Sequence, residues 1–123
     1  MHSVIAVVED EPELQALYRL MLAAKGYGIA YMAANADDAV DRYARCATKP
    51  DLVIMDRRLD RSSGLEAARR ILDMHPEARI LFATADDSEG LRGPPGIVGI
   101  LQKPFSMEAM FGAIERALAS NIA

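Results

Sequence analysis

The chain has 123 residues, a formal net charge of −4 and a hydrophobic content of 51%. This length suits one domain whose core needs no disulfide, and the single cysteine, Cys46, excludes an internal one. No apolar run approaches the ~20 residues of a membrane-spanning helix, Met-His-Ser does not show the pattern expected of a secretion signal, and the acidic balance argues against nucleic-acid binding. We therefore expect one soluble, cytoplasmic domain over residues 1–123 that binds neither membrane nor nucleic acid.

The N-terminal segment predicts a strand, a helix and a second strand. A short apolar run indicates a buried strand over Ser3–Val8. Pro12 is favoured at the first position of a helix and Gly26 just past its end. The apolar stripe of this helix consists of Leu14, Leu17, Tyr18, Met21 and Leu22. A weaker strand follows over Gly28–Met32.

The central strand has the clearest pattern. It follows a helix that Asn35 caps and that ends before Lys49-Pro50. The run Leu52–Met55 is uniformly apolar, which is typical of a strand buried on both faces of a parallel sheet. Asp56 comes next, so its carboxylate is expected at the carboxyl edge of the sheet, where open α/β folds bind ligands.

Two helices and two strands complete the pattern. Gly64 precedes a third helix, which His75-Pro76 ends, and we expect His75 to be exposed. Strands are predicted over Arg79–Ala83 and Ile97–Leu101, and Ser106 caps a last helix. The inward residues expected are Leu65, Ala68, Ile71 and Leu72 in the third helix, and Met107, Met110, Phe111, Ile114 and Leu118 in the last.

Alternating strands and helices predict an α/β fold with parallel, right-handed crossovers. The expected architecture is a doubly wound five-stranded parallel sheet of order 2-1-3-4-5, as in flavodoxin-like proteins. Residues 86–96 contain three glycines and Pro94-Pro95, so the fourth helix is expected to be abbreviated or disordered.

Polar residues follow the strands at one edge of this sheet. The order of the strands makes the first and third neighbours, which brings Glu9 and Asp10 beside Asp56. Three close carboxylates repel one another, and a hard cation such as Mg²⁺ relieves the repulsion. Thr84 and Lys103 end the fourth and fifth strands and supply a hydroxyl and an ammonium for the oxygens of a phosphoryl group.

Together these motifs resemble the response-regulator receiver domain (CheY-like) of two-component signalling, over essentially the whole chain. The matching motifs are Glu9-Asp10, Asp56, Ser63-Gly64, Thr84-Ala85 and Lys103-Pro104-Phe105. The resemblance implies that Asp56 accepts a phosphoryl group, with Mg²⁺ bound, from a histidine kinase or a histidine phosphotransfer protein. It also implies a downstream protein target or an output domain outside this chain.

The resemblance assigns a role to each matching position. Asp56 is the nucleophile, Thr84 donates to one phosphoryl oxygen, and Lys103 pairs with another. The implied Mg²⁺ ligands are Asp10, Asp56, Glu9 through water and the backbone carbonyl of Arg58. The domain is then a phosphoacceptor with intrinsic autophosphorylation and autodephosphorylation, and no other enzyme activity.

The chain departs from the family pattern at several positions. Ile100 stands where most receivers carry a switch aromatic, and Asp60 replaces a frequent proline. Phe82-Ala83-Thr84 is similar to an atypical receiver subgroup associated with HWE-type histidine kinases. In that subgroup, output would come from rearrangement of residues 86–96.

Two other functional classes remain open. A phosphatase of the haloacid dehalogenase type also uses an aspartate nucleophile and Mg²⁺, but it needs a second acid where this chain has Arg58. A pseudo-receiver would serve as an interaction module that is never phosphorylated. We also hypothesise that Arg58 pairs with Asp86 across the site entrance; the alternative is that both are solvated charges.

Overall fold

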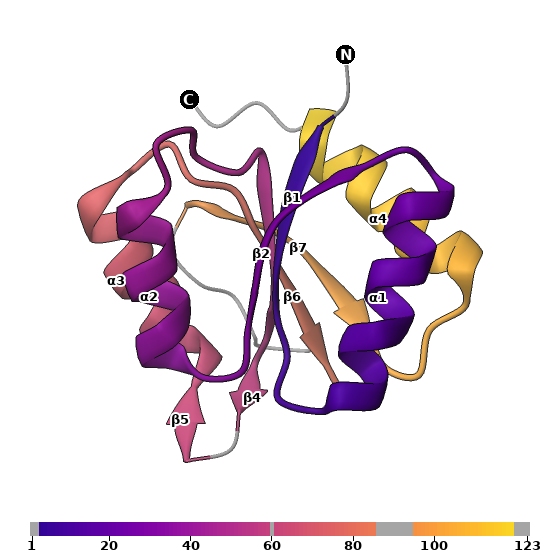
Figure 1. The fold of residues 1–123 in the computed structure, drawn as a ribbon, viewed down its shortest axis with the longest axis horizontal. Coiled ribbons are helices and arrows are strands. Elements are labelled where there is room, and N and C mark those ends of the chain that lie inside the picture. The colour runs from indigo at the N-terminus through magenta and orange to yellow at the C-terminus, as the bar shows by residue number, and fades with distance from the viewer. Residues whose placement is uncertain (1–2, 60, 86–94, 120–123) are drawn as a thin grey trace.

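A parallel sheet forms the centre of the computed structural model, which describes residues 3–59, 61–85 and 95–119 (Figure 1). The sheet has five strands in the order β2-β1-β3-β6-β7. Their bounds are β1 (Val4–Val8), β2 (Gly28–Ala33), β3 (Leu52–Asp56), β6 (Ile80–Thr84) and β7 (Ile97–Gln102). The predicted 2-1-3-4-5 order and flavodoxin-like fold are confirmed, with β6 and β7 as its fourth and fifth strands. Residues 86–94, which include most of the expected fourth helix, lie outside the described residues.

Among the described residues, two helices cover each face of the sheet (Figure 1). The helices α1 (Pro12–Ala24) and α4 (Met107–Ala119) share one face, and α2 (Ala36–Arg45) and α3 (Gly64–Met74) share the other. Both predicted side-chain caps are present: Asn35 Oδ1 accepts from the Asp38 amide at 2.8 Å, and Ser106 Oγ accepts from the Ala109 amide at 3.0 Å. No helix in this part of the chain has the length and apolar content to cross a membrane.

The strand residues alternate between the two cores. In β3, Leu52 and Ile54 pack beneath α1 and α4, whereas Val53 and Met55 pack beneath α2 and α3. All four are at most 1% exposed. This two-sided burial explains why the strand is a continuous apolar run rather than an alternation with polar residues.

Some local expectations were wrong. Leu17 and Met107, expected to face inward, are 46% and 54% exposed, because the buried stripes of α1 and α4 are narrower than their apolar composition suggests. His75 is half-buried instead of exposed, and its Nδ1 lies 2.7 Å from the Tyr43 hydroxyl. The third helix begins at Gly64 itself.

A two-stranded hairpin between β3 and α3 was not predicted. Its strands are β4 (Arg58–Leu59) and β5 (Ser62–Ser63), paired antiparallel. Arg61 lies between them with a φ of 59°, in the left-handed region that few residues other than glycine adopt. Two-residue strands are too short to show a periodicity, so no sequence signal marks the hairpin. It lies at the carboxyl end of the sheet (Figure 1).

We expect the protein to lose stability steeply between pH 10 and pH 12. Burial raises the pKa of Tyr18 and Tyr31, and it raises the pKa of Tyr43 to about 12. The folded state therefore retains phenolic protons that the unfolded state loses above pH 10, so unfolding becomes easier as pH rises. Each tyrosine contributes about 1.4 kcal/mol per pH unit to the fall in unfolding free energy. Urea unfolding at several pH values measures the slope.

A matched variant isolates one of these protons. In Tyr43→Phe the slope should decrease by about 1.4 kcal/mol per pH unit relative to the unmodified protein, because one titrating group is gone. An identical slope in the two proteins would show that Tyr43 ionises as readily in the fold as outside it.

Candidate functional site

The register of the sheet brings the predicted site residues to one edge. Val8 of β1 lies opposite Met55 of β3, so the next residues, Glu9 and Asp56, emerge side by side. Asp56 in turn lies opposite Ala83, the residue before Thr84. Parallel strands end on the same edge, so residues distant in the chain become neighbours without any local signal.

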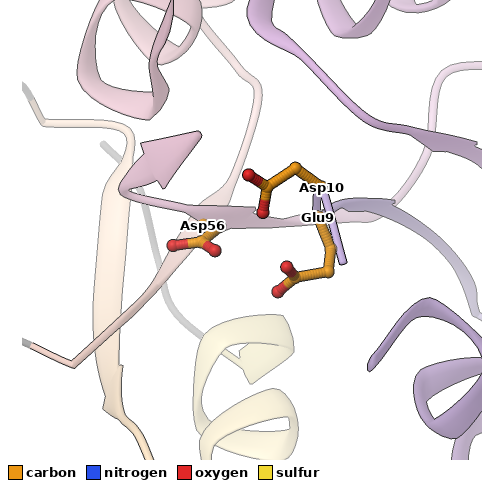
Figure 2. A group of neighbouring side chains, drawn as sticks. All are labelled: Glu9, Asp10 and Asp56. Atoms are coloured by element: carbon orange, nitrogen blue, oxygen red, sulfur yellow. The ribbon is translucent and has the colours of Figure 1, made fainter. Parts of the chain in front are cut away.

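Three carboxylates converge at this edge. Oxygens of Glu9, Asp10 and Asp56 all lie within 4.8 Å of one another, and Figure 2 shows the three groups turned toward a common space. Glu9 is 1% exposed and Asp56 8%, whereas Asp10 is half-buried. Like charges at this spacing repel by several kcal/mol in a partly desolvated site, so the arrangement needs a compensating cation.

Lys103 supplies one compensating charge. Its ammonium Nζ donates to Glu9 Oε1 and to Asp56 Oδ2, each at 2.9 Å. Burial raises the pKa of Glu9, against its hydrogen bonds from the Glu11 amide and Lys103. Burial acts to lower the pKa of Lys103, but the bonds to both carboxylates outweigh it and the net shift is upward. The lysine therefore stays charged and joins β1, β3 and β7 at the site.

Backbone contacts hold the Asp56 carboxylate and its loop. The Arg58 amide donates to Asp56 Oδ1 at 3.2 Å, while Lys103 holds Oδ2. The Arg57 amide donates to the Ala83 carbonyl at 2.9 Å, and the Gly64 amide donates to the Arg57 carbonyl at 2.9 Å. Both carboxylate oxygens are thereby oriented at the end of β3.

Thr84 lies on the far side of Asp56 from Glu9. It is 1% exposed, and its carbonyl accepts from the Lys103 amide at 2.7 Å. The peptide bond between Lys103 and Pro104 is cis. The structure thus gathers Glu9, Asp10, Asp56, Thr84 and Lys103 at one edge, as the sequence predicted.

Of the other positions named from the sequence, Arg58 and Ile100 are among the described residues and Asp86 is not. Arg58 lies at the site and, with Asp10, lines an open cleft of about 770 Å³. Ile100 lies in β7 and packs against the core beneath α2 and α3. Asp86, the expected partner of Arg58, lies outside the described residues.

Sequence reasoning missed two supporting contacts. The Gln15 side chain donates to the Glu9 carbonyl at 2.5 Å, and the Glu11 amide donates to Glu9 Oε2 at 3.0 Å. These bonds tie the start of α1 to the acidic pair. The only signal in the sequence was the polar Gln15 near the start of α1. The structure shows that this helix lacks a side-chain cap.

The residues present fit a hard divalent cation. All three candidate donor groups are carboxylates, and Mg²⁺ prefers oxygen ligands from one or two carboxylates together with water. The cleft beside Asp10 leaves room for water on that side of the cluster. Asp10 and Asp56 could hold such an ion, with the Arg58 carbonyl and Glu9 as further candidates.

Gly64 is expected to tolerate no side chain. A Cβ there would overlap the Asp56 carbonyl oxygen and sit 2.9 Å from the Arg57 Cα, and backbone atoms cannot move aside cheaply. Gly64→Ala should lower the unfolding free energy by about 2 kcal/mol, as overpacked core sites do. Urea unfolding measures the loss.

Gly28→Ala is the matched control, because its new Cβ would meet the Val4 side chain at an ordinary 3.6 Å. We expect Gly28→Ala to unfold within about 0.5 kcal/mol of the unmodified protein. Equal stability of the two alanine variants would contradict the close approach at Gly64.

Comparisons with known proteins agree on one type of domain. A family model for the response regulator receiver domain matches residues 5–115. The chain is 32% identical over 119 residues to the uncharacterized transcriptional regulatory protein YxjL of Bacillus subtilis. The match covers 92% of this chain but 53% of that protein. The chain therefore spans about half the length of that relative.

Two solved structures are similar throughout. The receiver domain of the PhyR response regulator from Erythrobacter litoralis has a TM-score of 0.83 and 30% identity, covering 99% of this chain and 96% of that one. The receiver domain of a sensor histidine kinase from Pseudomonas aeruginosa has a TM-score of 0.85 and 28% identity, covering 98% and 100%. The latter carries a magnesium ion coordinated in its active site cleft.

Proposed function

The chain belongs to the response regulator receiver domain family of two-component systems, and we propose that it receives a phosphoryl group on Asp56. The donor would be a histidine kinase or a histidine phosphotransfer protein. The observation that carries this proposal is the contact of one lysine, Lys103, with both Glu9 and Asp56 inside a cluster of three carboxylates. Such a cluster has a carboxylate nucleophile, further oxygen donors and the Lys103 ammonium within reach of one another.

The transfer needs little covalent chemistry from the protein. An oxygen of Asp56 attacks the phosphorus of the donor, and the phosphorus–nitrogen bond of the phosphohistidine breaks as the new phosphorus–oxygen bond forms. The electron pair of the broken bond leaves with the imidazole. The carboxylate oxygen attacks directly, so the step needs no general base, and catalysis is positioning and charge stabilisation.

Each neighbouring residue then has a defined task. Lys103 exchanges its contact with a carboxylate for one with a phosphoryl oxygen, and the Thr84 hydroxyl donates to another. Asp10, Asp56 and the Arg58 carbonyl would hold Mg²⁺, with Glu9 acting through water. Bound there, the ion would neutralise charge that develops on the transferred group. Apart from accepting and hydrolysing its own phosphoryl group, the domain would have no enzyme activity.

The proposed partners follow from the family and from the similar structures. Receiver domains work with kinases and downstream targets, and one similar structure is the anti-anti-sigma factor PhyR from Bartonella quintana, at 28% identity. We propose that this chain likewise signals through protein contacts, or through an output domain in a longer protein. The Phe82-Ala83-Thr84 segment supports a kinase of the HWE type as the donor.

Titration with Mg²⁺ and beryllofluoride, an analogue of the phosphoryl group, tests the proposal. We expect the NMR resonances of Thr84 and Lys103 to respond to beryllofluoride only when Mg²⁺ is also present. Unchanged resonances would identify a pseudo-receiver instead. Steady hydrolysis of phosphate esters under the same conditions would identify a phosphatase.

A further inference from the structure

Tyr18 is a buried polar residue that the proposed site does not use. It lies on α1, is 1% exposed, and packs in the core beneath α1 and α4. Among the described residues its hydroxyl has no hydrogen-bond partner. Buried hydroxyls are nearly always paired, so an unpaired one in a well-packed core calls for a physical reason.

The ring of Tyr18 contacts the loop that carries Lys103. Its centroid lies 5.8 Å from that of Phe105, with a 37° angle between the ring planes, a favourable tilted geometry. Phe105 is two residues beyond Lys103, and Pro104 lies between them. A displacement of the Lys103 backbone therefore acts on the ring through a short, stiff segment.

The carboxylates of the site also influence Tyr18. Burial, followed by the charges of Glu9 and Asp56, raises its pKa strongly. The phenol consequently remains protonated and can donate a hydrogen bond. The Ile100 side chain has no polar group and cannot donate a hydrogen bond to the site. Tyr18 is a buried aromatic residue whose hydroxyl can donate one.

We propose that Tyr18 couples phosphorylation of Asp56 to helix α1. The proposal rests on the function proposed above. When Lys103 turns from Glu9 toward a phosphoryl oxygen, the Glu9 carboxylate loses a donor. The Tyr18 hydroxyl then donates to that carboxylate. Phe105 moves together with Lys103, and the Tyr18 ring moves with Phe105, which it contacts.

The surface beside these residues would register the change. Phe105 and Lys103 line an apolar pocket of about 320 Å³ together with Leu14 and Leu17 of α1. The same residues that move in the proposed coupling thus form the walls of an exposed pocket, so its shape would depend on the state of Asp56.

Fluorine NMR of the full chain labelled with 3-fluorotyrosine tests the coupling. The chain has four tyrosines, which Tyr→Phe variants assign one by one. On addition of Mg²⁺ and beryllofluoride we expect the Tyr18 resonance to move, while those of Tyr31 and Tyr43, in the core beneath α2 and α3, stay within their linewidths. Backbone resonances of Thr84 and Lys103 are recorded in the same sample.

The two proposals fail in different ways. If Thr84 and Lys103 respond but Tyr18 does not, the coupling is overturned and phosphorylation of Asp56 is unaffected. If Thr84, Lys103 and Tyr18 all fail to respond, the phosphorylation proposal is overturned and the coupling falls with it. Equal movement of Tyr18, Tyr31 and Tyr43 would indicate a general rearrangement and would also overturn a specific coupling.

A hydroxyl deletion separates coupling from packing. Tyr18→Phe keeps the ring and its contact with Phe105, and we expect it to weaken beryllofluoride binding about fivefold, the effect of one net hydrogen bond. Tyr43→Phe deletes a buried hydroxyl on the opposite face, which contacts His75, and should leave the affinity unchanged. Unchanged affinity in Tyr18→Phe would show that Tyr18 serves the core alone.

Discussion

Replacing Asp56 by asparagine is expected to abolish phosphorylation, lowering the rate at least about a thousandfold. Asparagine keeps the shape of the side chain, and its carbonyl oxygen can accept the Lys103 hydrogen bond that Asp56 Oδ2 accepts at 2.9 Å. Its amide is neutral and a poor nucleophile, so only the chemistry is removed. Incubation with Mg²⁺ and acetyl phosphate, followed by borohydride reduction and peptide mapping, measures the modification, because reduction converts an aspartyl phosphate to homoserine.

The experiment needs a carboxylate-to-amide control elsewhere on the surface. Asp73 is exposed near the end of α3, away from the carboxyl ends of the strands, and Asp73→Asn should be modified at Asp56 at the normal rate. Homoserine at another aspartate, or retained phosphate in Asp56→Asn, would show that a different residue accepts the phosphoryl group.

Removing the Lys103 ammonium should have the second-largest effect. In Lys103→Met the carboxylates of Glu9 and Asp56 lose their shared partner, and Glu9 is 1% exposed. Breaking a buried pair leaves an uncompensated charge, so we expect a loss of about 3 kcal/mol in unfolding free energy without Mg²⁺. The rate of phosphorylation should also fall about a hundredfold, as it does when a donor to a developing anion is deleted.

Two comparisons show whether charge is the cause. Lys103→Arg keeps the positive charge at the same position and should retain most of the stability. Addition of Mg²⁺ should stabilise Lys103→Met more than the unmodified protein, because a bound cation replaces the missing charge. Thermal unfolding with and without Mg²⁺ measures both effects, and equal losses in the arginine and methionine variants would point to packing instead.

The elements with strong local patterns could be predicted from the sequence. The apolar run Leu52–Met55, buried on both faces, and the caps at Asn35 and Ser106 depend on residues close together in the chain. The edge position of Asp56 follows from the strand that precedes it. These features were predictable because periodicity, capping and strand burial are properties of neighbouring residues.

Contacts between distant segments required the tertiary structure. The Tyr43–His75 contact joins residues 32 apart, and the hairpin at Arg58–Ser63 has no periodic pattern. The exposure of Leu17 depends on how far α1 rotates against the sheet, which its own sequence does not specify.

The sequence alone determined which chemical groups end each strand and that parallel strands carry them to one edge. The tertiary structure decided the distances: 2.9 Å from Lys103 to each of Glu9 and Asp56, and a Tyr18 hydroxyl left without a partner among the described residues. The physical reason is that strand order and register place groups on a common edge, whereas the position of each side chain within it results from packing and charge balance among segments nearly a hundred residues apart.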